Sequence, residues 1–152
     1  MGPRVLKFVV NLWPPFLGAG IRVRHIAEDW SRIEVQMTLR WFNKNYVGTQ
    51  FGGSLFSMTD PFYMLMLIKR LGPDYRVWDQ RGEIKFIRPG RGTVSTQMAL
   101  TEAQLADIRG ATADGSKHFA SFDMNIVDAE GAVVAKVRKT IYIRKREVST
   151  TA

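Results

Sequence analysis

Apolar and polar residues alternate along much of the chain, and one long stretch is apolar throughout. Residues 32–40 alternate strictly, which is typical of a half-buried strand, and we expect residues 21–27 to pair with them. Residues 41–51 lose any period and predict a loop. Residues 52–71 are apolar on nearly every face, so they predict one long helix that is buried all round.

The regions on either side of this helix complete the predicted layout. Residues 4–12 predict a short helix that ends at Pro14-Pro15, with a loop over residues 16–20. Four more strands are predicted after the long helix, over residues 82–88, 93–102, 118–127 and 133–144, and we expect them to form a meander. The pattern favours an α+β fold in which an antiparallel sheet wraps around the apolar helix. We expect a single domain over residues 1–152, with its core at about 20–145.

Composition narrows the class of protein. The chain has 152 residues, with 22 Lys and Arg against 14 Asp and Glu, so its net charge is +8. It has no cysteine, which excludes disulfide scaffolds, thiolate metal sites and cysteine nucleophiles. A reducing compartment suits such a chain, and we expect the cytoplasm. The apolar stretch at residues 55–68 is too short to span a bilayer, so we expect no membrane anchor.

Residues 45–60 carry the candidate chemistry. Gly52 and Gly53 stand just before a predicted helix, where exposed backbone N–H groups can bind an anion or a developing oxyanion. Asp60 lies among apolar residues, and a carboxylate there is costly unless it is paired, neutralised or used in chemistry. The alternative is that Asp60-Pro61 marks a local helix break with a solvated carboxylate. His25 and His118 accompany no metal-ligand pattern, so no metal site is expected.

These residues resemble a known family. The spacing Asn-x-x-Gly-x-x-His-Gly-Gly followed by Asp is similar to that of hotdog-fold acyl-CoA thioesterases of the phenylacetic-acid-degradation type. Asn45, Gly48, Gly52, Gly53 and Asp60 stand at the matching positions. The string from Trp13 to Leu55 is more similar still to an uncharacterised branch of this superfamily, a domain of unknown function. The resemblance implies a hotdog fold with one central helix and covers almost the whole chain.

The resemblance also implies roles for individual residues. Asp60 would be the general base or nucleophile, Gly52 N–H would form the oxyanion hole, and Asn45 would orient water or the acyl carbonyl. No cofactor is implied. The residues expected to bind substrate are Phe51, Gly53, Ser54, Phe56, Arg88 and Arg91. In two respects the sequence departs from the pattern, because Phe51 replaces the family histidine and Pro61 should kink the helix at the site.

Helix geometry predicts a site shared between two chains. Gly52 and Asp60 are eight residues apart on one predicted helix, which separates them by roughly 12 Å at about 1.5 Å per residue. That distance is too long for both to act on one carbonyl. We therefore expect a homodimer, or a dimer of dimers, in which Gly52 and Asn45 of one chain face Asp60 of the other.

The positive charge suggests a polyanionic ligand. Lys136, Arg138 and Arg144 share a face of the last predicted strand, while Arg88 and Arg91 flank a turn. No pattern of basic residues interleaved with exposed aromatic residues is visible, so we rank the phosphates of coenzyme A above a nucleic acid. The expected function is hydrolysis of a small or medium acyl-CoA. The alternatives are a non-catalytic protein that binds acyl-CoA or acyl chains, and a basic protein associated with nucleic acid.

Overall fold

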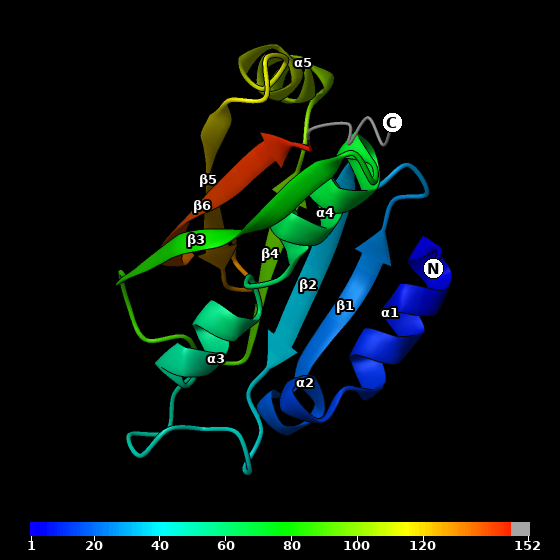
Figure 1. Cartoon of the computed structure of the whole chain (residues 1–152). Helices are drawn as coiled ribbons and strands as arrows, with labels where there is room; N and C mark the ends of the chain where they lie inside the picture. The colour runs from blue at the N-terminus through cyan, green and yellow to red at the C-terminus, as the bar shows by residue number, and fades with distance from the viewer. Residues whose placement is uncertain (147–152) are drawn as a thin grey trace.

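A six-stranded antiparallel sheet curves around a helical layer in the computed structural model of the chain, which describes residues 1–146 (Figure 1). The strands are β1 (Ile21–Ile26), β2 (Arg32–Thr38), β3 (Tyr75–Phe86), β4 (Thr93–Ala99), β5 (Lys117–Val127) and β6 (Val133–Lys145). Their order in the sheet is β1-β2-β4-β5-β6-β3. The predicted α+β architecture is confirmed. Residues 147–152 of the predicted domain lie outside the described residues.

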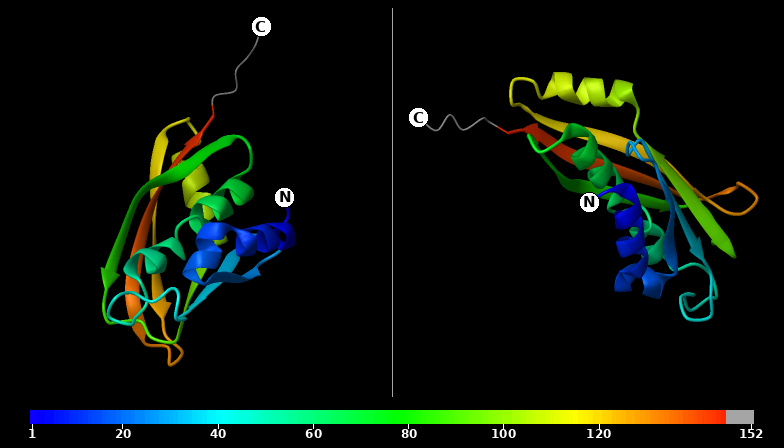
Figure 2. Two further views of the ribbon diagram at one scale, coloured as in Figure 1. Left: turned by 90° about the horizontal axis from the view of Figure 1, so that it is seen from below. Right: turned by 90° about the vertical axis from the view of Figure 1, so that its right-hand side faces the viewer.

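The helices gather mainly on one side of the sheet. They are α1 (Pro3–Leu12), α2 (Pro14–Ala19), α3 (Gly52–Ser57), α4 (Phe62–Leu71) and α5 (Glu102–Ala111). The right-hand view of Figure 2 shows α1 to α4 on the same side of the sheet. None of the helices within residues 1–146 is both long and apolar enough to cross a bilayer.

The long predicted helix is interrupted, as the proline in it indicates. Asp60 and Pro61 lie in a turn between α3 and α4, because Pro61 has no N–H to continue the helical ladder. The Asp60 N–H instead donates to the Ser57 carbonyl at 3.2 Å. Met58 and Phe62, on either side of the turn, are fully buried in the core. The two helical segments together fill the concave side of the sheet.

Several details of the layout differ from the prediction. The predicted loop at residues 16–20 is mostly helical, because Pro14 and Pro15 begin a second helix instead of only ending the first. The predicted strand over residues 93–102 stops at Ala99, and α5 follows it. A capping box starts α5, in which Thr101 and Gln104 satisfy each other's backbone N–H groups.

The strand order is not a complete meander. β3 pairs with β6 at one edge of the sheet, while β4 pairs with β2 in the middle. β3 also begins at Tyr75, seven residues before the predicted start at Gly82. Its register with β6 shifts between Asp79 and Arg81, so a bulge interrupts the alternation on which the prediction depended.

Candidate active site

Asn45 organises the loop that precedes α3. Its Oδ1 accepts the Thr49 N–H at 2.9 Å, and its Nδ2 donates to Thr49 Oγ1 at 2.9 Å and to the Gln50 carbonyl at 3.3 Å. Gly48 allows the turn with a φ of 81°. The Asn45 amide is therefore used to hold the loop, which the sequence alone did not reveal.

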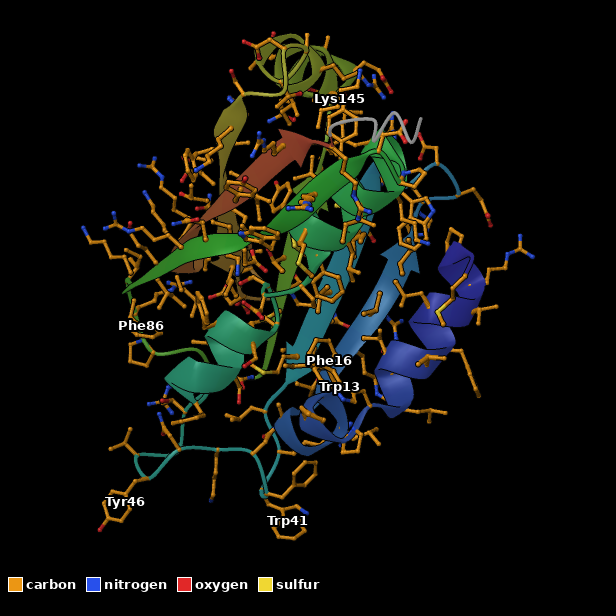
Figure 3. All side chains as sticks on the ribbon, viewed as in Figure 1. Trp13, Phe16, Trp41, Tyr46, Phe86 and Lys145 are labelled. Atoms are coloured by element: carbon orange, nitrogen blue, oxygen red, sulfur yellow. The ribbon has the colours of Figure 1, made fainter. Side chains whose placement is uncertain are left out.

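Gly52 is the first residue of α3, and an aromatic ring fills the space that a side chain would need. A Cβ atom at Gly52 would lie 2.8 Å from Cζ of Phe86. Phe86, labelled in Figure 3, lies at the end of β3 beside α3. The residue before the helix is Phe51, whose side chain makes no capping hydrogen bond. A side chain at position 52 would therefore push the Phe86 ring aside.

A pocket of about 360 Å³ lies where the loop, the start of α3 and the end of β3 meet. It is lined by three residues expected at the site, Asn45, Gly52 and Arg88. Its other lining residues are Thr49, Gln50, Leu55, Phe86, Ile87, Pro89 and Gly90. The volume is within the usual range for a small-molecule site. The structure therefore brings together residues that are more than 40 positions apart in the sequence.

Gln50 is a pocket residue that the sequence analysis missed. Its side chain is buried, and its Nε2 donates to the Gly92 carbonyl at 2.9 Å, which fixes the orientation of the amide. Its Oε1 atom accepts no hydrogen bond from any described residue. A buried acceptor without a partner costs free energy, and this one belongs to a residue that lines the pocket. No sequence signal distinguishes Gln50 from an ordinary loop residue.

Asp60 lies outside the pocket lining. Its side chain is 51% exposed, which agrees with the interpretation as a helix break, and its Oδ1 accepts a hydrogen bond from the Lys139 Nζ at 2.6 Å. Lys139 is only 2% exposed and comes from the middle of β6. Within one chain, the carboxylate of Asp60 therefore does not line the pocket that contains Asn45 and Gly52.

Lys139 also lies 3.1 Å from the Asp79 carboxylate and 5.3 Å from the centre of the Phe56 ring. The residue opposite it on β3 is Gly82, where a Cβ would lie 2.5 Å from the Phe56 ring. Burial is the main cause that raises the pKa of Asp79, and the nearby Asp60 adds to it, while Lys139 opposes the shift. A buried cation is thus shared by two carboxylates at the edge of the helical layer.

Arg88 lines the pocket, whereas Arg91 lies in a neighbouring hollow. The Arg88 guanidinium forms an ion pair with Asp128, so a ligand phosphate would have to compete with this carboxylate. Arg91 does not line the pocket, but it shares a neighbouring hollow of about 510 Å³ with Arg88 and Asp128. The two hollows meet at Arg88.

The other residues expected at the site lie around α3 but not in the pocket lining. They are Phe51, Gly53, Ser54 and Phe56. The ring of Phe51 lies against Gly53, where a Cβ would be 2.6 Å from it. In the described part of the chain, no three His, Cys, Asp or Glu side chains gather closely enough to hold a metal ion.

Comparison with solved structures identifies the fold. A protein from Pseudomonas aeruginosa described as a probable thioesterase is 16% identical, with a TM-score of 0.80 over 94% of this chain and 95% of that chain. A thioesterase from Haemophilus influenzae is 14% identical, with a TM-score of 0.68 over 99% and 95%. The PaaI protein of the E. coli phenylacetic acid degradation operon is 18% identical, with a TM-score of 0.63 over 95% and 92%. The hotdog fold is confirmed.

Comparison of the sequence with family models gives a match over nearly the whole chain. No curated protein matches the sequence. The matching model, described as a domain of unknown function, DUF4442, extends over residues 2–143. The chain therefore belongs to the DUF4442 family, an uncharacterised branch that shares the hotdog fold of the thioesterases.

Proposed function

We propose that the protein hydrolyses the thioester of a small or medium acyl-CoA at a site formed by two copies of the chain. The observation that carries this proposal is the separation of two half-sites. One half is the pocket with Asn45 and Gly52, and the other is the exposed carboxylate of Asp60 beside Lys139. The thioesterases among the similar structures support the reaction class.

The proposed chemistry needs one base, one donor and an apolar slot. Asp60 of one chain removes a proton from water, and the water oxygen attacks the thioester carbonyl in the pocket of the other chain. The Gly52 N–H donates to the resulting oxyanion. The carbon–sulfur bond then breaks, and the departing thiolate takes the proton from Asp60, which yields a carboxylic acid and the free thiol. Leu55, Phe86 and Ile87 supply the apolar wall for the acyl group.

The edge strand β3 supports the proposed dimer. It forms one edge of the sheet over 12 residues, and an unpaired edge of this length is a ready template for another strand. Its last residue, Phe86, lines the pocket. A second copy that pairs along β3 would bring its own α3–α4 turn, with Asp60, toward this pocket in a two-fold arrangement.

Complementation between inactive chains tests the shared site. Asp60→Ala and Asn45→Ala chains, each inactive alone, should regain part of the activity when mixed, because each mixed dimer contains one intact site. The matched control mixes Asn45→Ala with Gly52→Val, where both sites remain broken and no activity should return. If mixed dimers form and the first pair stays inactive while the wild type is active, the shared site is wrong.

A non-catalytic acyl-CoA-binding protein is the second candidate, and Phe51 favours it. The histidine of the thioesterase pattern is missing at this position, and with it a donor to the thioester. Turnover of a panel of acyl-CoA thioesters separates the two functions. Asp60→Asn should reduce turnover at least about a hundredfold while binding remains. Saturable acyl-CoA binding without any turnover by the wild type would establish the binding protein instead.

A further inference from the structure

A row of aromatic side chains crosses three strands on the face of the sheet opposite α3 and α4. Strand register places Phe119 of β5, Tyr142 of β6 and Trp78 of β3 side by side. Trp78 and Tyr142 are stacked, with ring centres 4.6 Å apart and planes at 6°, and Phe119 meets Tyr142 edge-on at 5.7 Å. Trp78 is 46% exposed and Phe119 is 51% exposed. Such a cluster on the outer face of a sheet is not explained by the core.

A row of cations lies next to this aromatic row. Two positions away from the aromatic residue on each strand, on the same face, the register aligns three cations: Lys117, Arg144 and Arg76. The Nε of Arg144 donates to the Gly115 carbonyl, while Arg76 and Lys117 are exposed. Arg76 and Lys117 therefore present two cations of this row to a ligand on the outer face.

Cations also lie on the far side of the aromatic row. A hollow of about 480 Å³ there is lined by Lys85, Lys136 and Arg138 among other residues. Arg138 is neutralised by Asp123, to which it donates two hydrogen bonds of 2.7 and 2.8 Å. The outward positions of β3, β5 and β6 together carry seven Lys or Arg and two carboxylates, Glu83 and Asp123. Among the described residues, Lys and Arg therefore outnumber carboxylates on this face around two exposed rings, Trp78 and Phe119.

We propose that this outer face of β5, β6 and β3 binds single-stranded nucleic acid. Aromatic rings offer stacking platforms for bases of any sequence, and flanking cations hold the phosphates. Eight residues of β6 separate the rows of Arg144 and Lys136, which is about 26 Å at about 3.3 Å per residue. That length suits a short single strand, at the lower end of the roughly 4–16 nucleotides typical of such sheets.

This inference is independent of the proposed thioesterase. The outer face uses none of the pocket residues, and a dimer paired edge to edge along β3 would leave it accessible. A second copy is a poor occupant, because stacking two such faces would bring their cation-rich surfaces together. The sequence analysis ranked nucleic acid below coenzyme A because it found no pattern of basic residues interleaved with exposed aromatic residues. The alignment of Trp78 with Tyr142 and Phe119 became visible only with the strand register.

Fluorescence anisotropy with labelled dT12 and rU12 tests the proposal at low and physiological salt. Saturable binding is expected, and Trp78→Leu should weaken it about tenfold, since stacking on one ring is removed. Trp78→Phe keeps a ring and should retain most of the affinity. Combined Arg76→Gln and Lys117→Gln should flatten the plot of log affinity against log salt by about 1.4, or about 0.7 for each phosphate that is no longer neutralised.

Matched controls lie elsewhere on the chain. Trp41→Leu removes an exposed tryptophan from the loop at the opposite end, labelled in Figure 3, and Arg40→Gln with Lys44→Gln removes two exposed cations. Both should leave binding unchanged, and thermal unfolding verifies that all variants fold. The proposal is overturned if no saturable binding occurs at low salt, or if the controls weaken binding as much as the test variants.

Two further outcomes would assign the face to another ligand. The affinity should rise from dT2 to dT6 if a strand lies along the face. If the affinity does not rise and coenzyme A competes fully, the face binds a single nucleotide, and the proposal that it binds a nucleic acid strand is wrong. Sedimentation velocity tests whether a second copy of the chain occupies the face instead. If Trp78→Leu converts a larger assembly into a smaller one and no oligonucleotide binds, the face is an interface between copies.

Discussion

The ammonium of Lys139 lies 2.6 Å from the Asp60 carboxylate, although the lysine is buried and the aspartate is half exposed. The same ammonium lies 3.1 Å from Asp79, which is the more buried of the two carboxylates. A buried lysine is costly without partners, so at least one aspartate must compensate it. Their different exposures suggest a division of labour, in which Asp79 compensates the lysine and Asp60 remains accessible to water and substrate.

Unfolding free energies of variants should reveal this division. Lys139→Met should destabilise the protein by up to about 3 kcal/mol, the lower end of the range for breaking a buried pair, because Asp79 keeps some exposure. Adding Asp79→Asn to Lys139→Met should recover more than half of that loss, since the more buried of the two carboxylates is then no longer left without its cation. Asp60→Asn alone should cost less than about 1 kcal/mol, as expected for an exposed partner. Urea unfolding measures all three.

The reverse pattern would contradict the division. If adding Asp60→Asn to Lys139→Met recovered more stability than adding Asp79→Asn, Asp60 would be the structural partner of Lys139 and a poor candidate for the base. The Arg138–Asp123 pair offers a matched control, because both partners are exposed. Asp123→Asn should change the stability by less than about 1 kcal/mol.

The pH dependence of stability should depend on Asp79. Burial raises the pKa of this carboxyl above its usual value near 3.8, so folding favours its protonated form. Its contribution to stability is fully present below the unfolded value and is lost as the pH rises through the folded value. The wild type should therefore lose stability relative to Asp79→Asn as the pH is raised from about 4 toward neutrality. Parallel curves of stability against pH for the two proteins would show that folding does not raise the pKa of Asp79.

Much of the fold could be predicted from the sequence because each signal was local. The alternation over residues 32–40 and the apolar run over 52–71 identified a strand and the central helical region, and Pro61 indicated the interruption. The start of β3 was missed because the bulge at Asp79–Arg81 breaks the alternation. The helix α5 was missed although Thr101 and Gln104 form a capping box, since the strand pattern before it was extended too far.

The site could be predicted only in part because its members come from distant segments. The motif located Asn45 and Gly52, and the structure places both at the pocket with Arg88. The link between Asp60 and Lys139 joins residues 79 positions apart and depends on the strand order, which no local pattern encodes. The local bonds of Asn45 were also invisible, because a side chain that holds a loop and one that binds a substrate look the same in a sequence.

Gly52 offers a test of the pocket wall. Gly52→Ala should push the Phe86 ring aside, since its Cζ would lie 2.8 Å from the new Cβ. Phe86 is exposed, so the ring can move, and the stability should fall by less than about 1 kcal/mol. The KM for acyl-CoA should rise instead, because the moved ring narrows the pocket. Gly52→Ala with Phe86→Leu should restore the KM in part. A KM unchanged by Gly52→Ala would mean that this wall does not contact the substrate.

Variants of Arg88 test whether the positive charge beside the pocket binds the nucleotide part of coenzyme A. Its guanidinium lies between the pocket and the hollow that holds Arg91, where two phosphate groups could be bound in place of Asp128. Arg88→Ala or Arg91→Ala should raise the KM for acyl-CoA several-fold, while turnover of a short thioester without the nucleotide stays unchanged.

Asp128→Asn provides the opposite test. Asp128 competes for Arg88, so its charge should weaken phosphate binding, and the substitution should lower the KM for acyl-CoA. In the wild type, Asp128 Oδ1 accepts hydrogen bonds from the Glu130 and Ala132 N–H groups. The amide oxygen of asparagine can accept both, so the turn should remain folded. Added salt should raise the wild-type KM and raise that of Arg88→Ala less, because exposed ion pairs are screened over about 8–10 Å at physiological ionic strength. Equal effects of Arg88→Ala on both substrates would mean that Arg88 acts through the acyl pocket or through folding, and the nucleotide would have to be placed elsewhere.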